Sequence, residues 1–168
     1  MRVEEADDVA ALVVHANAEN LAAFPPTIAA GYRDEIVRIA GRLSGAETYV
    51  ADLDGEVVGT VSLVTDAGHD GHPWPPNGAV IRFLAVAPNH AGRQLGRRLT
   101  ETCVDRARAL GAAFVGLHTA PVMTAARRIY ERAGFVRAPD HDFSPAAHYG
   151  DADPDDPPWG LAYVLRFD

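Results

Sequence analysis

A phosphate-binding turn is the first chemistry that the residue types suggest, in the segment PNHAGRQLGRRL (Pro88–Leu99). Gly92 and Gly96 lie four residues apart there, and the apolar run AVIRFLAVAP comes directly before them. A strand that leads into a glycine-containing helix start presents unpaired N–H groups and the positive end of a helix dipole. The segment therefore predicts an anion site that a phosphate group can approach closely, with neighbouring arginines as auxiliary donors.

Two common phosphate motifs are excluded. All 15 basic residues are arginine, so the Gly-x-x-x-x-Gly-Lys-Ser/Thr motif cannot occur. The full Gly-x-Gly-x-x-Gly dinucleotide motif is missing as well. A phosphate bound at this turn must belong to another scheme.

Metal and thiol chemistry find little support in the residue spacing. His69 and His72 lie three apart in a loop, without a nearby set of cysteine or carboxylate ligands, so no metal site is predicted. The single Cys103 excludes an internal disulfide framework. It falls on the apolar stripe of a predicted helix, which makes it a poor covalent nucleophile.

Length and charge restrict the class of protein. The chain of 168 residues is predicted to form one domain, residues 1–168, with 48% hydrophobic and 23% charged residues. A net charge of −8 argues against nucleic acid or an anionic membrane as a partner. No apolar window is long enough for a membrane helix, and the acidic start MRVEEADDVAALVV is a poor secretory signal. We therefore expect a cytoplasmic protein.

Apolar spacing and turn residues predict the elements before the turn. Two amphipathic helices are expected, over VAALVVHANAENLAAF and YRDEIVRIAGRL. An antiparallel hairpin of Thr48–Leu53 and Glu56–Thr65 should follow, around the Asp54-Gly55 pair that favours a type I′ turn.

The turn itself lies within a predicted strand–helix–strand unit. The strand is Ala79–Pro88, the helix runs from Gly92 to about Leu110, and the second strand is Ala113–Thr119. A further helix over PVMTAARRIYERAG is expected to carry Pro121 in its first turn. The segments FVR and LAYVLRF are the last predicted strands.

This order of elements, with IRFLAVAPNHAGRQLGRRL and the downstream ARRIYERAGF, resembles the GCN5-related N-acetyltransferase (GNAT) family over about Ala6–Phe167. The resemblance implies an α/β (α+β) fold with a mixed, mostly antiparallel central sheet flanked by about four helices. The sheet would splay open between the strands Ala79–Ala87 and Ala113–Thr119. Acetyl-CoA, the implied cosubstrate, would lie in that split, without a metal.

The resemblance also implies which residues bind acetyl-CoA. Its pantetheine would bond to the backbone of Leu84, Ala85 and Val86. Its pyrophosphate would lie on the amides of the turn, at Ala91, Gly92, Arg93, Gln94, Leu95, Gly96 and Arg97.

The turn departs from the family pattern Gln/Arg-x-x-Gly-x-Gly/Ala. Gly96 fits, but Ala91 replaces the usual Gln or Arg, and Gln94 replaces the first usual glycine. Backbone donation survives both changes, and Gly92 is a second source of flexibility.

Tyr130 matches the tyrosine that the family uses as general acid, which protonates the departing CoA thiolate. The base is left open. The glutamate that many relatives carry early in the matching strand is missing at Ala79–Ile81. His118, His141, Asp142 and solvent remain as alternatives.

The sequence thus predicts an N-acetyltransferase whose acceptor amine attacks the thioester directly in a ternary complex. The expected acceptor is a small-molecule or peptide amine, and a homodimer is left open. The acceptor pocket should be built from the first two helices and the loops His69–Pro76 and Ala138–Trp159. The alternative is a CoA-binding sensor without catalysis, which the changes at Ala91 and Gln94 favour and Tyr130 opposes.

Overall fold

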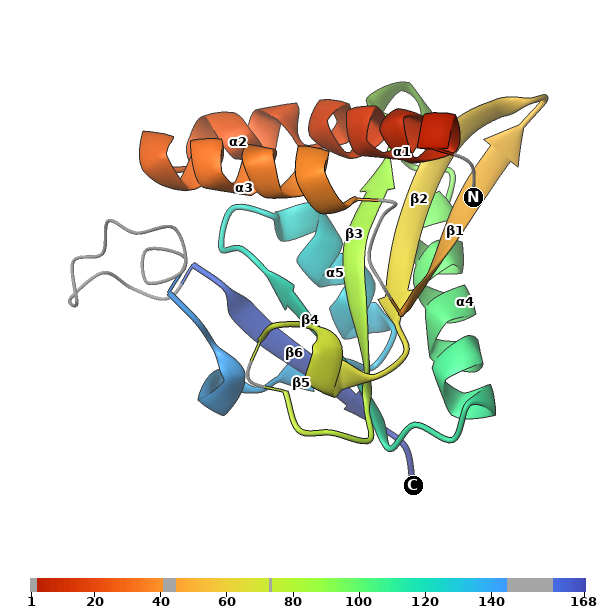
Figure 1. The fold of residues 1–168 in the computed structure, drawn as a ribbon, viewed down its shortest axis with the longest axis vertical. Helices are drawn as coiled ribbons and strands as arrows, with labels where there is room; N and C mark the ends of the chain where they lie inside the picture. Colours follow the sequence, from red (N-terminus) through yellow and green to blue (C-terminus); the bar gives the residue numbers. More distant parts are fainter. Residues whose placement is uncertain (1–2, 41–44, 73, 145–158) are drawn as a thin grey trace.

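The computed structural model describes residues 3–40, 45–72, 74–144 and 159–168. Six strands form one sheet in the order β1-β2-β3-β4-β6-β5 (Figure 1). Only β3 and β4 pair in parallel, which confirms the predicted mixed, mostly antiparallel sheet. The strands are β1 (Ala46–Leu53), β2 (Glu56–Val64), β3 (Ala79–Val86), β4 (Phe114–Thr119), β5 (Val136–Arg137) and β6 (Leu161–Arg166).

Five α-helices are described where about four were expected: α1 (Val3–Ala16), α2 (Ala18–Ala23), α3 (Pro26–Ile39), α4 (Leu95–Ala109) and α5 (Thr124–Arg132). The additional helix arises because the first predicted helix divides at Asn17, whose side-chain amide donates to the Val13 carbonyl at 2.9 Å. None of the helices in the described ranges is long and apolar enough to cross a membrane.

The prolines place two helix starts differently from the sequence prediction. Pro26 begins α3, since the first helical position needs no N–H donor, so this helix starts before the predicted Tyr32. Pro121 was expected in the first turn of α5, which is wrong. Residues 120–123 instead form a turn in which the Met123 N–H donates to the Ala120 carbonyl at 3.0 Å, and α5 starts at Thr124.

The predicted hairpin is present, and its turn residues have the expected conformation. Asp54 and Gly55 both have positive φ, 55° and 88°, as a type I′ turn requires. The turn pairs Leu53 with Glu56 and brings β2 antiparallel to β1. The turn of two residues thus connects β2, the neighbour of β3, to β1 at the outer edge of the sheet.

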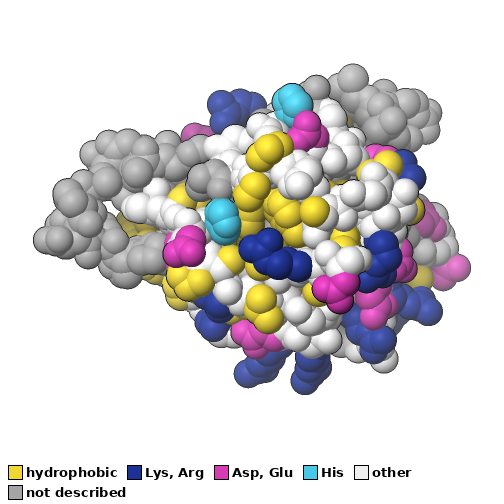
Figure 2. Space-filling model, turned by 90° about the horizontal axis from the view of Figure 1, so that it is seen from below, with side chains coloured by type: hydrophobic (Ala, Val, Ile, Leu, Met, Phe, Trp, Pro, Cys, Tyr) yellow, Lys and Arg dark blue, Asp and Glu magenta, His cyan; other side chains and the backbone are white. Residues whose placement is uncertain are grey.

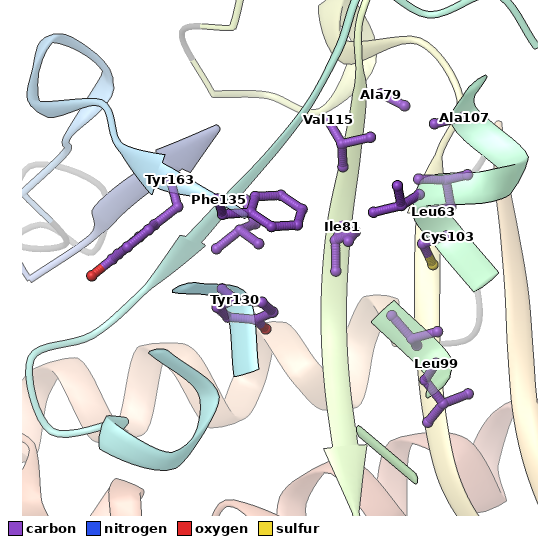
Figure 3. Close-up of a cluster of buried hydrophobic side chains, with 13 residues drawn as sticks. Leu63, Ala79, Ile81, Leu99, Cys103, Ala107, Val115, Tyr130, Phe135 and Tyr163 are labelled. Atoms are coloured by element: carbon purple, nitrogen blue, oxygen red, sulfur yellow. The ribbon is translucent and has the colours of Figure 1, made fainter. Parts of the chain in front are cut away.

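Helices cover both faces of the sheet. On one face, Leu99 and Cys103 of α4 and Tyr130 of α5 pack with Ile81 of β3 (Figure 3). On the other face, side chains of α1 and α3 pack against Phe83 and Ala85 of the same strand. The predicted apolar stripe of α4 ends before Leu110, which is 45% exposed because it caps the helix instead of facing the sheet.

The sheet splits between its two parallel strands. Pairing of β3 with β4 covers only Ala79–Ile81 against Val115–Leu117. Beyond Ile81 the described strands diverge, β3 staying on β2 and β4 staying on β6. This confirms the predicted splay.

The space-filling view from below shows acidic and basic side chains intermixed around central apolar ones (Figure 2).

Candidate acetyl-CoA and acceptor site

A β-bulge shapes β3 at the point where the sheet splits. Between two regular pairs with β2, at Arg82 and at Ala85, β3 has two residues, Phe83 and Leu84, where β2 has one. Phe83 has φ 53°, in the left-handed region that a bulky residue rarely occupies. A residue inserted in this way bends a strand and breaks its ladder of hydrogen bonds.

The bulge also changes which face the side chains take. Arg82 and Phe83 are consecutive, yet both side chains lie on the α1–α3 side, the guanidinium 4.9 Å from the centre of the Phe83 ring. Leu84 and Val86 return to the α4 side. Regular alternation therefore resumes after a single additional residue.

The backbone of Leu84–Val86 lies in the part of β3 that does not pair with β4 in the described sheet. N–H and C=O groups along such an edge are free to bond an extended ligand in the way a neighbouring strand would. The structure thus brings the residues expected to bind pantetheine to the split.

A cavity of about 370 Å³ opens beside this edge, between the helices α2 and α3 and the ends of β3 and β4. Its volume lies in the range of sites for small molecules. Part of its wall is aromatic, since the Phe24 ring lies edge-on to Tyr32 at 6.0 Å and to Trp159 at 5.5 Å. Further lining residues come from the split and from α5: Ile81, Arg82, Phe83, Leu84, His118, Thr119, Ala126 and Tyr130.

Tyr130 reaches this cavity from α5. Its side chain is 5% exposed and lies beside Phe135, with the ring centres 5.9 Å apart (Figure 3). A phenol carries its proton at neutral pH, and burial raises the pKa of Tyr130 further, so the hydroxyl stays protonated. A general acid must start protonated, and this environment meets that condition. The catalytic role itself stays a prediction.

The turn before α4 differs from its prediction in one respect. The helix begins at Leu95 instead of Gly92, and Gln94 before it has φ 61°. Gln94 therefore holds a left-handed conformation at the position where the family pattern has glycine, the residue that adopts it without steric cost. Gly92 also has positive φ, 79°.

Hydrogen-bond donors are available at this turn. The first bond within α4 runs from the Arg98 N–H to the Gln94 carbonyl at 3.0 Å, so the three amides of Leu95–Arg97 precede it. Gly96 allows α4 to approach α5, since a Cβ there would lie 2.9 Å from Ile129 Cδ1. Four of the predicted pyrophosphate residues, Ala91–Gln94, are exposed.

The three candidate bases have different environments. His118 lines the cavity, and its Nε2 lies 2.8 Å from the carbonyl oxygen of His141. Burial lowers the pKa of His118 to about 4, which leaves the ring neutral and weakly basic. The His141 ring stacks on Trp74 at 4.9 Å.

Asp142 is engaged with Arg137, whose two terminal nitrogens donate to its carboxylate at 2.9 and 2.7 Å. Burial alone would raise its pKa, but these bonds and the Ala162 N–H hold the pKa of Asp142 below its usual range. The carboxylate is thus a weak base, and its bonds to Arg137 and to the Ala162 N–H attach this segment to β6. Of the three candidates, only His118 lines the described cavity.

A buried network of charges lies next to the cavity, and sequence reasoning missed it. Arg82 forms ion pairs with Glu35 of α3 and, at 2.9 Å, with Asp70 of the loop between β2 and β3. The side chains of Arg82 and Glu35 are 11% and 9% exposed. One signal was present in the sequence: Arg82 is the only charge in the apolar run AVIRFLAVAP, and a buried charge requires partners.

The predicted acceptor loops are described only in part. His72 and Phe143 line the cavity from the loop before β3 and from the segment after β5. Residues 145–158 of the predicted Ala138–Trp159 loop, and Pro73 of the other loop, lie outside the described residues.

Comparison with known proteins identifies the family. The model of the Acetyltransferase (GNAT) family matches residues 15–135. The chain belongs to this family. It is 35% identical over 133 residues to the mycothiol acetyltransferase of Sanguibacter keddieii, an alignment that covers 79% of this chain and 41% of that protein. The chain thus spans about two fifths of the length of two curated relatives that it matches.

Solved structures share the fold at low sequence identity. A GNAT-family acetyltransferase of Staphylococcus aureus has a TM-score of 0.68 at 13% identity, covering 99% of this chain and 95% of its own. A Bacillus subtilis acetyltransferase in complex with CoA has a TM-score of 0.62 at 19% identity, covering 96% and 92%. These likenesses establish the architecture.

Proposed function

We propose that this protein is an acetyl-CoA-dependent N-acetyltransferase that acts on a small-molecule or peptide amine. The observation that carries the proposal is the junction at β3. There the bulge and the split together present the backbone of Leu84–Val86 beside a cavity that Tyr130 lines. The CoA complex of the structurally similar Bacillus subtilis protein supports the choice of cosubstrate.

The backbone edge of β3 would bind the pantetheine as an added strand, and a backbone N–H near Leu84–Val86 would polarise the thioester carbonyl. The amides before Arg98 and the exposed turn Ala91–Gln94 would bind the pyrophosphate. Each contact uses main-chain groups, so the replacements at Ala91 and Gln94 remove no donor that the site needs.

The amine would enter from the aromatic side of the cavity and attack the thioester carbon directly. A C–N bond forms, the C–S bond breaks, and the thiolate takes the phenolic proton of Tyr130. The proton of the amine leaves to solvent, since the neutral His118 is too weak a base in this environment, and the Tyr130 phenolate takes a proton back from solvent. Positioning of the two substrates then supplies most of the acceleration.

The second candidate is a CoA-binding sensor without catalysis. Gln94 favours it, because a left-handed glutamine at the turn departs from the glycine that the family pattern has there. The position of Tyr130 on the wall of the cavity opposes it, since a sensor has no need for an acid beside the thioester.

One experiment separates the two candidates. Free thiol released from acetyl-CoA is measured over a panel of small amines and peptide N-termini, and acetyl-CoA binding is measured separately by calorimetry. We expect binding together with thiol release that depends on at least one amine. Binding without release by any amine would establish the sensor, and absence of binding would overturn both candidates.

A further inference from the structure

We propose that Asp70, His72 and His118 form a binding site for a divalent transition-metal ion at the acceptor end of the cavity. One carboxylate oxygen of Asp70 and one ring nitrogen of each histidine lie within 4.8 Å of one another. Asp70 and His72 come from the loop between β2 and β3, and His118 comes from β4. This inference goes beyond the proposed function: the binding of the ion does not depend on it, whereas the role of the ion toward the acceptor rests on it.

Two of the three groups have an acceptor atom that the protein leaves unsatisfied. The Asp70 side chain is fully buried, its Oδ1 accepts from Arg82 at 2.9 Å, and its Oδ2 has no partner among the described residues. His118 faces the carbonyl oxygen of His141 with Nε2, which must therefore carry a hydrogen. Nδ1 of the neutral ring is then a buried lone pair, and in the part of the chain that the structure describes it has no partner either.

A cation satisfies such an arrangement. A carboxylate oxygen and an imidazole lone pair are both acceptors, so they cannot satisfy each other, and leaving them unpaired in the interior is costly. Two histidines and one carboxylate are a common ligand set for Zn²⁺ and related ions. With metal–ligand distances of about 2.0–2.2 Å, binding would draw the three groups together by roughly 1 Å.

The neighbouring contacts have the form that supports metal ligands. The Arg82 guanidinium fixes the Asp70 carboxylate, and the His141 carbonyl fixes the tautomer and orientation of the His118 ring. Such outer contacts orient ligands for a metal. The rings of His72 and His118 also contact each other, with centres 4.9 Å apart.

The site has a place for a fourth ligand. Three protein ligands leave at least one coordination position open, as in sites where a metal binds a substrate group. His72 and His118 both line the cavity, so this position would face the space that we assign to the acceptor. The ion would thus select acceptors that carry a metal-binding group besides the amine.

The probe for this inference is Zn²⁺ alone. Protein treated with a chelator and then freed of it is titrated with ZnCl₂ by calorimetry, without acetyl-CoA or amine. We expect saturable binding of one equivalent. Titration with Co²⁺ should produce the visible absorption bands of a coordinated ion, and added Zn²⁺ should displace them. Failure of the wild-type protein to bind either ion would overturn the proposal.

Matched variants locate the site. His72→Phe keeps a ring to stack on Phe143, now at 4.5 Å, and Asp70→Asn keeps an acceptor for Arg82. Each should weaken Zn²⁺ binding at least about tenfold while the circular dichroism spectrum stays unchanged. His69→Phe, in the same loop but outside the cluster, should leave the affinity unchanged. Equal affinity in His72→Phe and wild type, or a loss in His69→Phe as large as in His72→Phe, would contradict the assignment.

Discussion

The two sides of the split are made of different parts of the chain. The cofactor side, which comprises β3 after Ile81, the turn at residues 91–94 and the start of α4, presents mainly backbone groups. The acceptor side, which comprises α2, α3, the loop at residues 66–72 and the end of β4, presents aromatic rings and buried charges. Backbone N–H and C=O groups remain when most side chains are substituted. A buried network of ion pairs, in contrast, depends on each of its side chains.

This difference explains how the turn can depart from the family pattern. Ala91 and Gln94 alter side chains, and the N–H groups beside them remain. On the acceptor side, the removal of Arg82 would leave two carboxylates without their common partner. Variants on the two sides should therefore differ in what they change and by how much.

The largest effect is expected on the acceptor side. Arg82→Met strands the buried carboxylates of Glu35 and Asp70, so the free energy of unfolding should fall by about 3–5 kcal/mol. Urea denaturation measures this. The matched control is Arg97→Met, which breaks an exposed pair with Glu101 and should change stability by no more than about 0.5 kcal/mol. Equal losses in both variants would show that the buried network does not hold the acceptor side together.

Tyr130→Phe tests the chemistry between the two sides. Loss of the general acid should lower kcat about 100-fold or more, while the Kd for acetyl-CoA, which depends on the backbone, stays nearly unchanged. Thiol-release kinetics and calorimetry measure the two quantities. Tyr163→Phe is the control, because its hydroxyl bonds to Glu131 and Arg127 and its ring does not line the described cavity. Turnover by Tyr130→Phe at the rate of the control would remove Tyr130 from the mechanism.

Gln94→Gly tests how far the cofactor side tolerates substitution. Glycine adopts φ 61° without strain, so stability should rise by up to about 1 kcal/mol and acetyl-CoA should bind at least as tightly. The opposite kind of change at a neighbouring position is Gly92→Ala. Because Gly92 has φ 79°, this change should lower the free energy of unfolding by about 1 kcal/mol. Thermal unfolding and calorimetry compare them. Weaker acetyl-CoA binding in Gln94→Gly would mean that the glutamine side chain itself contacts the cofactor.

The smallest effect is expected for Cys103→Ala. This thiol is fully buried, and burial raises its pKa to about 12, so the reactive thiolate is scarce at neutral pH. Turnover should stay within about twofold of wild type, although the lost sulfur lowers stability by about 1 kcal/mol. Mass spectrometry of protein incubated with acetyl-CoA should find no acetyl group on this residue. An acetylated Cys103 would replace direct attack with a two-step transfer.

The cofactor side could be predicted from the sequence because its signals are local. The Asp54-Gly55 turn and the apolar run of β3 each act within a few residues, and both were found at their expected positions, whereas α4 follows the Gly92 turn but begins at Leu95 instead of Gly92. The start of α5 was predicted too early because proline fits both the first turn of a helix and the turn before it.

The acceptor side could not be predicted in the same way. Arg82 and Glu35 are 47 residues apart, and no sequence spacing announces that a loop brings Asp70 to the same point. The three residues of this network come from a helix, a loop and a strand, and these elements meet only after folding. The bulge was also missed, since phenylalanine is an unusual residue at positive φ and nothing in the run IRFLAV marks it.

The bulge in β3 amounts to one residue more than regular pairing with β2 requires. If Phe83 were deleted, Leu84 would pair with Val61 of β2. All the remaining side chains of the strand would keep their present faces. The strand without it would be an ordinary member of a regular antiparallel meander. The bent edge beside the cavity therefore differs from a regular strand by one residue, which corresponds to three nucleotides in the gene.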